Sequence, residues 1–288
     1  MKHLTYKYSY IWIIASRWQG FHRSLKKDFP LLNNGFSVAY KQRLIRSAVR
    51  GASLMYILSK SVNKTFDQQV ALTTGMLSAL FDDLIDIGAE DFGTIEMMIT
   101  KPETAPVVSH LGETARILYI SLLGKMQGWQ KQQLTGVLMN LLETEKAVKA
   151  TRKGEWQQRG TCAFFVYLTL VCIPLEDVNQ EVAFKYGEYL QLLDDYEDFH
   201  ADDPPDNFFR SYPGFDLTRY YLNEIKPKLP LIFNFEFNHA FFCEFVETYH
   251  VFQIQSYKNI HKEENFLVPV KRGFIKFVVQ KLNGNVPF

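Results

Sequence analysis

Apolar residues recur at intervals of three and four along most of the chain, which is the pattern of helices with one buried face. In the stretch from Tyr40 to Ser61, for example, Leu44, Ala48 and Ala52 fall on one side. The alternation typical of half-buried strands is scarce. The pattern predicts helices over residues 40–61, 66–87, 111–126, 130–149, 161–172, 178–199, 218–228, 238–261 and 268–282.

A few residues with known preferences mark the ends of these helices. Asn63 or Thr65 is placed to cap the second predicted helix, and Gly88 is placed to end it. Pro204 and Pro205 end the helix over residues 178–199. We find no internal repeat, low-complexity segment or Ser/Gly linker, and 288 residues fit one large helical core. The sequence therefore predicts a single all-α domain over residues 1–288.

The composition narrows the classes of partner. A net charge of +1 with 22% charged residues gives no basic surface for nucleic acid and no acidic tail. No stretch reaches the roughly 18 apolar residues of a membrane span, and the apolar run over residues 8–15 is too short and too closely followed by basic residues for a signal peptide. Three cysteines without metal-binding spacing indicate reduced thiols, so we expect a cytoplasmic protein.

The first acidic cluster, Asp82, Asp83 and Asp86, closes the apolar helix predicted over residues 66–87. Asp86 lies four residues after Asp82 and three after Asp83, so the carboxylates share a helix face and repel one another. They also lie near the helix C-terminus, where the helix dipole disfavours anions. A bound cation would relieve both penalties.

The second acidic cluster, Asp194, Asp195 and Asp198, has the same spacing and closes the helix predicted over residues 178–199. One such cluster is usually a solvated helix end, but two copies indicate a function. Mg²⁺ prefers oxygen ligands, keeps several waters and is commonly completed by substrate phosphates. We therefore expect Mg²⁺ between two facing carboxylate clusters and a diphosphate.

The pair of clusters resembles the two DDxxD motifs of class I isoprenoid synthases, a group that includes trans-prenyl diphosphate synthases, squalene and phytoene synthases, and terpene synthases. The surroundings agree, because Leu80 and Phe81 precede the first cluster and Gln191 precedes the second. The resemblance covers roughly residues 40–210 in element order, with residue-level matches only in the motifs. It implies a bundle of antiparallel helices around a deep apolar cavity, with the aspartates at its mouth.

The same resemblance implies a chemistry. Bound Mg²⁺ would promote ionisation of an allylic prenyl diphosphate, and an aromatic cavity would shelter the carbocation from water. The 15% aromatic content suits such a cavity, although an aromatic-rich core would explain it equally. All six aspartates are the expected catalytic and metal-binding residues: Asp82 and Asp86, with Asp83 as ligand or support, and Asp194 and Asp198, with Asp195 supporting.

A first group of candidate diphosphate-binding residues lies before the helix predicted to start near Cys162. Prenyl synthases carry a Lys-Thr pair near the corresponding helix, and Lys153, Arg159 and Thr161 are the candidates here. Thr161 could also cap the helix. A solvated basic loop is the alternative interpretation.

A second group, Arg43 and Arg46, lies upstream of the first acidic cluster, and Arg50 continues the same helical stripe. Chain-elongating synthases bind isopentenyl diphosphate there with a Gly-Gly-Lys-Arg-x-Arg-Pro segment, whose Gly-Gly and Pro are absent from this chain. The stripe could also be a solvated helix face. The departure from the family pattern weakens the chain-elongating interpretation.

The resulting hypothesis is a Mg²⁺-dependent terpene synthase acting on a prenyl diphosphate. The alternatives are a prenyltransferase of the same fold, either chain-elongating or head-to-head, and a non-catalytic partner subunit. A di-metal oxidase would need Glu-x-x-His pairs, which the sequence lacks. Peripheral membrane contact stays open, and a homodimer is expected from family habit alone. The cavity side of the clusters is expected to include Ser78, Ala79, Leu190 and Gln191.

Overall fold

The computed structural model describes residues 29, 35–151, 157–197, 207–247, 249 and 250. Its main helices are α2 (Val38–Ser61), α3 (Gln68–Asp86), α4 (Phe92–Thr100), α5 (His110–Leu123), α6 (Gly128–Thr151), α7 (Gln157–Leu170), α8 (Gln180–Glu197), α9 (Phe208–Ser211) and α10 (Leu217–Tyr220). The part of the chain described here contains no strand, only an isolated antiparallel bridge between Val178 and Phe233. The predicted all-α class is confirmed. The helix predicted over residues 268–282, the last part of the helix predicted over residues 238–261, and the helix end predicted at Pro204 and Pro205 lie outside the described residues.

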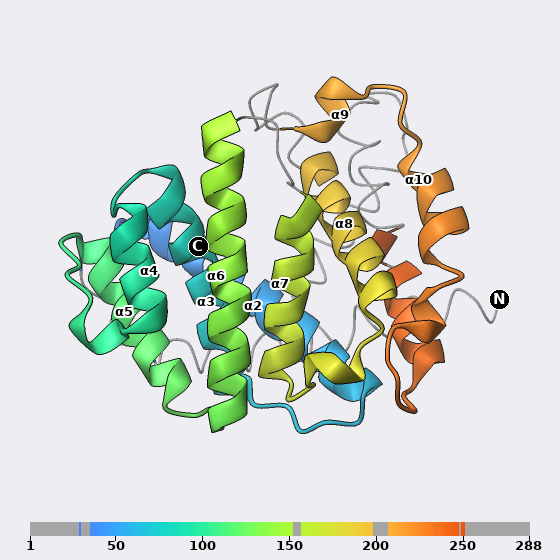
Figure 1. Ribbon diagram of the computed structural model, residues 1–288, viewed down its shortest axis with the longest axis horizontal. Helices are drawn as coiled ribbons and strands as arrows, with labels where there is room; N and C mark the ends of the chain where they lie inside the picture. Colours follow the sequence, from blue (N-terminus) through green and yellow to red (C-terminus); the bar gives the residue numbers. More distant parts are fainter. Residues whose placement is uncertain (1–28, 30–34, 152–156, 198–206, 248, 251–288) are drawn as a thin grey trace, which may run out of the picture.

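The helices form two layers with short elements at both sides. In Figure 1, α6, α7 and α8 run side by side at the front, and α2 and α3 lie behind them. α4 and α5 flank one side, α10 flanks the other, and α9 lies at the top of the view, above the end of α8. The predicted apolar face of α2 is confirmed, because Leu44, Ala48 and Ala52 are fully buried. Burial of this kind, at about 1.5–3 kcal/mol for each large side chain, holds the layers together. None of the helices described is long and apolar enough to cross a membrane.

The boundaries of α3 are partly as predicted. Gly88 follows the helix with a φ of 66°, a backbone conformation that suits glycine, so its predicted role in ending the helix is confirmed. The predicted caps are wrong. Asp67 caps α3 by accepting hydrogen bonds from the backbone N–H groups of Gln69 and Val70. Asn63 instead turns the chain after α2, with a φ of 51°.

α7 begins at Gln157 rather than near Cys162, so that boundary was also predicted wrongly. Contacts between helices extend the helix toward its N-terminus. Arg159 pairs with Glu145 of α6, and Gly160 lies directly against the backbone of α8. Thr161 therefore lies inside the helix and does not cap it.

Two helical hairpins of the fold, α2–α3 and α7–α8, meet through glycine in the same way. A Cβ atom on Gly51 would lie 2.8 Å from the Cα of Gly75, so the backbones of α2 and α3 are in contact. A Cβ atom on Gly160 would lie 2.1 Å from the carbonyl oxygen of Gly187, so α7 and α8 are equally close. In both hairpins this close approach fixes how the second helix lies on the first.

The hairpins are copies of one pattern, contrary to the expectation that the chain has no repeat. The helix-ending residues Ser61 and Leu170, and the positive-φ residues Asn63 and Cys172, are each 109 positions apart. Asp67 and Asn179, which accept hydrogen bonds at the start of α3 and α8, are 112 apart. Eight of the nineteen positions from Gln68 to Asp86 are identical to those 112 residues later: Gln68, Val70, Ala71, Gly75, Leu80, Asp82, Asp83 and Asp86.

Candidate functional site

Both acidic clusters lie at the same end of the bundle. Asp194 and Asp195 of the second cluster are in the last turn of α8, which ends, like α6, at the upper side of Figure 1. The first cluster lies there too, because Asp86 at the end of α3 is 3.5 Å from the Nζ atom of Lys149, near the end of α6. Lys149 also donates a hydrogen bond to the carbonyl of Ile85, so its charge opposes the C-terminal dipole of α3.

Asp83 is turned inward, with its side chain only 3% exposed. Its Oδ1 atom lies 2.7 Å from Nη1 of Arg43, and its Oδ2 atom accepts a 2.6 Å hydrogen bond from the Tyr40 hydroxyl. Burial, and after it the contact with Asp83, raises the pKa of Tyr40 far above its usual range. Both carboxylate oxygens of Asp83 are therefore used to join α3 to α2.

Asp82 and Asp86 face outward, with side chains 61% and 63% exposed. Desolvation by the surrounding protein, and then repulsion from Asp86, raises the pKa of Asp82 to about 6. Arg43, whose Nη2 atom lies 3.2 Å from Oδ2 of Asp82, opposes this effect but does not cancel it. The pair is thus accessible to solvent, and Arg43 beside Asp82 and Lys149 beside Asp86 only partly offset the repulsion between the two carboxylates, which is a suitable arrangement for a divalent cation.

Glu145 of α6 adds a further carboxylate beside this cluster, which the sequence analysis missed. Its Oε2 atom accepts a 2.7 Å hydrogen bond from Nη2 of Arg159, and its Oε1 atom lies 2.7 Å from Nε. Burial raises the pKa of Glu145, Arg159 lowers it, and Asp86 raises it again, so the ion pair lies within electrostatic reach of the first cluster. The spacing of Glu145 and Lys149, four residues apart on one helix face, was the available signal.

Asp195 repeats the inward position of Asp83 in the second cluster and is buried. Its Oδ1 atom accepts a 2.9 Å hydrogen bond from Nε2 of Gln191, and its Oδ2 atom accepts a 3.0 Å bond from the backbone N–H of Phe208. Its carbonyl oxygen accepts a 2.6 Å bond from Nδ2 of Asn207, the residue that caps α9. Asp195 therefore joins the end of α8 to the start of α9.

Asp194 is exposed, like Asp82. It lies within electrostatic reach of Tyr167 on α7, whose pKa is raised by burial, lowered by Arg50 and raised by Tyr249 and Asp194. Nη2 of Arg50 donates a 2.9 Å hydrogen bond to the hydroxyl of Tyr249. A Cβ atom on Gly51 would lie 3.6 Å from the Tyr167 hydroxyl, so this part of α2 faces α7.

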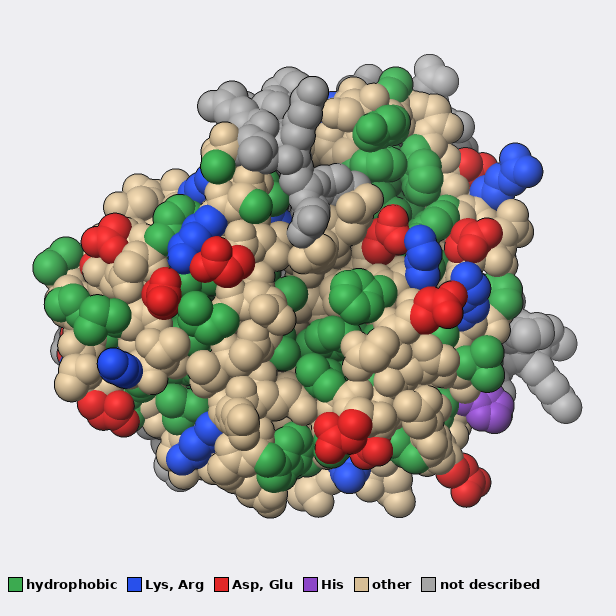
Figure 2. Space-filling model, in the orientation of Figure 1, with side chains coloured by type: hydrophobic (Ala, Val, Ile, Leu, Met, Phe, Trp, Pro, Cys, Tyr) green, Lys and Arg blue, Asp and Glu red, His purple; other side chains and the backbone are tan. Residues whose placement is uncertain are grey.

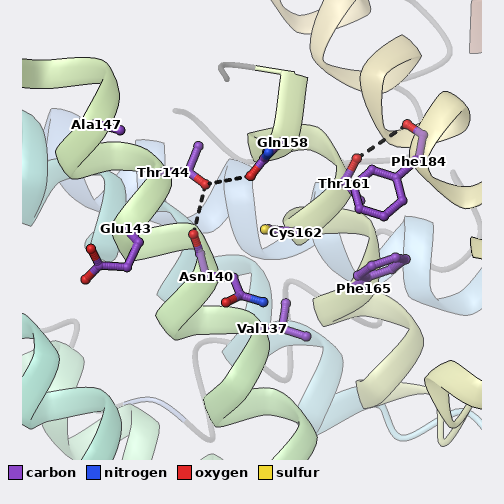
Figure 3. Close-up of a pocket in the computed structure, with 10 residues that line it drawn as sticks. All are labelled: Val137, Asn140, Glu143, Thr144, Ala147, Gln158, Thr161, Cys162, Phe165 and Phe184. Atoms are coloured by element: carbon purple, nitrogen blue, oxygen red, sulfur yellow. Dashed lines mark hydrogen bonds between the residues drawn. The ribbon is translucent and has the colours of Figure 1, made fainter. Parts of the chain in front are cut away.

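A cavity of about 250 Å³ opens on the front of the bundle. In Figure 3, Val137, Asn140 and Thr144 of α6 face residues of α7, and Phe184 of α8 covers one end. Figure 2 shows hydrophobic side chains along a hollow of this face. Thr161 and Phe165 are among the lining residues, which include no aspartate of either cluster. This cavity therefore differs from the predicted deep cavity with the aspartates at its mouth, which stays a prediction.

The structure does not bring all the predicted diphosphate-binding residues together. Arg159 is held by Glu145, and Thr161 is buried between α7 and α8, where its hydroxyl donates a 3.4 Å hydrogen bond to the carbonyl of Phe184. Arg46 is exposed on α2. Lys153 and Asp198 lie outside the described residues.

The predicted cavity-side residues are also dispersed. Ala79 is buried, whereas Ser78 is exposed. Gln191 binds Asp195, and Leu190 is half-buried against the hydrophobic core. Their expected role in lining a substrate cavity stays a prediction.

The chemistry of the exposed carboxylates fits Mg²⁺. Within the described ranges, no group of three or more His, Cys, Asp and Glu side chains is close enough together to hold a metal ion by itself. Mg²⁺ is often bound by only one or two carboxylates together with water and phosphate oxygens. Asp82 and Asp86 provide such a pair on one side, and Asp194 provides a carboxylate on the other.

The sequence matches no protein-family model, and neither curated proteins nor solved structures are found to be similar to it.

Proposed function

We propose that this protein is a Mg²⁺-dependent class I terpene synthase that ionises an allylic prenyl diphosphate. One observation carries the proposal. Two copies of a helical hairpin end in the same acidic motif at one end of the bundle, and in each copy the first aspartate is exposed while the second is buried and hydrogen-bonded. Repeated exposed carboxylates at helix C-termini are unfavourable without a cation, which supports metal binding as their purpose.

The roles of the residues follow from their positions. Asp82 and Asp86 would hold metal on one side, and Asp194 would do so on the other, with Asp198 placed beside it by the spacing of the motif. Asp83 and Asp195 would act as positioning residues, since their carboxylate oxygens accept hydrogen bonds or pair within the protein. Arg159 would bind the diphosphate through Nη1, because its Nε and Nη2 atoms face Glu145.

When bound, Mg²⁺ supplies Lewis-acid assistance to the leaving diphosphate. The allylic C–O bond breaks, the electron pair leaves with the diphosphate, and the carbocation cyclises, loses a proton or captures water. The residues of the chain then have to exclude water and orient the hydrocarbon, and the abundance of aromatic side chains suits a cationic intermediate.

The position of Arg43 favours a terpene synthase over a chain-elongating prenyltransferase. A second, metal-free diphosphate site would need Arg43 to be available for it. Its guanidinium instead contacts both Asp82 and Asp83. This supports one diphosphate per turnover.

Purified protein should be incubated with Mg²⁺ and geranyl, farnesyl, geranylgeranyl or geranylfarnesyl diphosphate, with and without isopentenyl diphosphate. Mass spectrometry of organic extracts would identify the products. We expect a hydrocarbon or alcohol from one diphosphate alone, lost in Asp82→Ala and in Asp194→Ala. Longer diphosphates formed only with isopentenyl diphosphate would instead indicate a chain-elongating enzyme, and a squalene-type hydrocarbon would indicate head-to-head coupling. No turnover would favour a non-catalytic partner subunit.

A further inference from the structure

Lys149 lies beside the first acidic cluster, although it belongs to α6 and the cluster belongs to α3. Its Nζ atom is 3.5 Å from Oδ1 of Asp86, and it donates a hydrogen bond to the carbonyl of Ile85. The side chains of Lys149 and Asp86 are both exposed. The ammonium group therefore lies at the open edge of the place proposed for the metal and the diphosphate.

The present contacts of Lys149 leave part of its binding capacity unused. An ammonium group has three N–H donors, and among the described residues Lys149 meets only Asp86 and the carbonyl of Ile85. Glu145, one turn earlier on α6, directs both carboxylate oxygens to Arg159. The pair of Lys149 with Asp86 is long and exposed, so water and salt screen it. The lysine is thus held loosely enough to change partners.

The position of Lys149 suits an anion that shares a metal ion with Asp86. Mg²⁺ demands near-octahedral geometry with ligand oxygens at about 2.1 Å, so neighbouring ligand oxygens lie about 3 Å apart. Nζ of Lys149 is already 3.5 Å from Oδ1 of Asp86. A phosphate oxygen next to Asp86 on one metal ion would therefore come within reach of the ammonium group.

We infer that Lys149 exchanges partners when ligand binds, leaving Asp86 to bind the diphosphate beside it. The inference rests on the proposed function and adds to it a residue outside both acidic motifs. A lysine suits the exchange because its charge is compact and its four-carbon stem is flexible. In the metal-free protein the ammonium group competes with Mg²⁺ for Asp86, and in the complex it supports the anion. Removing its charge should therefore change the two affinities in opposite directions.

The alternative role of Lys149 is purely structural, since its bond to the carbonyl of Ile85 also stabilises the C-terminus of α3. A structural role predicts that Lys149→Gln lowers the melting temperature and leaves the affinities for Mg²⁺ and pyrophosphate unchanged. The exchange of partners predicts a change in both affinities, so the two roles give different results.

The test is calorimetric titration of the full chain with inorganic pyrophosphate in excess Mg²⁺. We expect Lys149→Gln to weaken binding by about 10-fold or more, because a hydrogen bond to a charged group is lost, and Lys149→Arg to weaken it less. A second measurement follows the melting temperature as Mg²⁺ is added without pyrophosphate. Lys149→Gln should need less Mg²⁺ than wild type to reach the same increase above its own metal-free value.

Lys146→Gln is the matched control, because it removes the same charge from the same helix three residues earlier. Nζ of Lys146 is 2.6 Å from Oε1 of Glu143 and 3.4 Å from Oε2 of Glu96, and it has no contact with the first acidic cluster within the described part of the chain. This variant should bind Mg²⁺ and pyrophosphate like wild type. Equal changes in Lys146→Gln and Lys149→Gln would show a general charge effect and would overturn the inference.

The outcomes separate this inference from the proposed function. If wild type binds pyrophosphate with Mg²⁺ and Asp82→Asn loses it, the metal-dependent anion site of the proposed function stands. Either affinity staying at the wild-type value in Lys149→Gln would then overturn the exchange of partners by itself. If wild type does not bind pyrophosphate with Mg²⁺ at all, both the exchange and the proposed function are wrong.

Discussion

Within each acidic cluster, neighbouring aspartates have opposite environments. Asp82 faces solvent with a pKa raised to about 6, while Asp83, one residue and about 100° further around the helix, is buried against α2. Asp194 and Asp195 repeat this difference. The motif thus combines a residue suited to metal binding with one that fixes the helix bearing it.

Asp82→Asn should stabilise the metal-free protein at neutral pH. The folded-state pKa of Asp82 is raised above its usual 3.8, so the carboxyl stabilises the fold when protonated, and that stability is lost as the pH rises through about 6. Asparagine stays neutral, so the Asp82→Asn variant should melt about 1–3 °C above wild type at pH 7.5. The expected difference is small because the Asp82 side chain is largely exposed. Scanning calorimetry between pH 3.5 and pH 8 would show the difference disappearing below about pH 4. The same difference in melting temperature at every pH would contradict a raised pKa of Asp82 as its cause.

Asp83→Ala should destabilise the protein by about 3 kcal/mol, because it leaves the Tyr40 hydroxyl and one face of Arg43 without their buried partner. Urea unfolding would measure this change. Asp86→Ala is the matched control in the same cluster. Because the Asp86 side chain is exposed, its removal should change the free energy of unfolding by no more than about 0.5 kcal/mol. Similar losses in the two variants would mean that Asp83 does not anchor α3.

At the scale of helices, the glycine contacts set the geometry of the site. Gly187→Ala would place its Cβ atom 2.3 Å from the Cα of Thr161, so α7 and α8 would have to separate. We expect a loss of about 3 kcal/mol or more in free energy of unfolding, together with loss of activity. Gly136→Ala on α6 is the control, because its Cβ atom would meet nothing within 4 Å. This substitution should stabilise the helix by about 0.5–1 kcal/mol. Equal behaviour of the two variants would refute the close contact.

Sequence patterns predicted most helices because burial of one apolar face dominates their formation, as in α2. The start of α7 was missed because it depends on Glu145 and Gly187, which lie on other helices. The motif spacing predicted that Asp82 and Asp86 share a face. The inward turn of Asp83 was not predicted, because it depends on where Arg43 and Tyr40 lie across the helix contact.

The repeat was hidden for a different physical reason. Its apolar positions tolerate exchange between Leu, Phe and Tyr, as at Leu77 and Tyr189, because burial requires hydrophobic volume more than identity. The offset also changes from 109 to 112 in the connection between the helices, so no single offset aligns both helices of a hairpin.

At the scale of the whole molecule, ligand binding should appear as stability. A ligand that binds only the folded state stabilises it by about 2.7 kcal/mol when present at 100 times its dissociation constant. Mg²⁺ and pyrophosphate together should therefore raise the melting temperature of this 288-residue chain by about 4–5 °C. Mg²⁺ alone and pyrophosphate alone, each measured as a control, should give much smaller shifts. Absence of any shift with both would favour a non-catalytic subunit.

In both hairpins, the first aspartate lies seven positions after the contact glycine, Asp82 after Gly75 and Asp194 after Gly187. Seven residues are almost two helical turns, so the carboxylates are held at a fixed height and direction above the contact. One inserted residue in this interval would rotate the aspartates by about 100° away from the site. The connections between the helices, by contrast, already differ in length between the halves. Related chains are therefore expected to gain or lose residues in those connections and to keep the seven-residue interval unchanged.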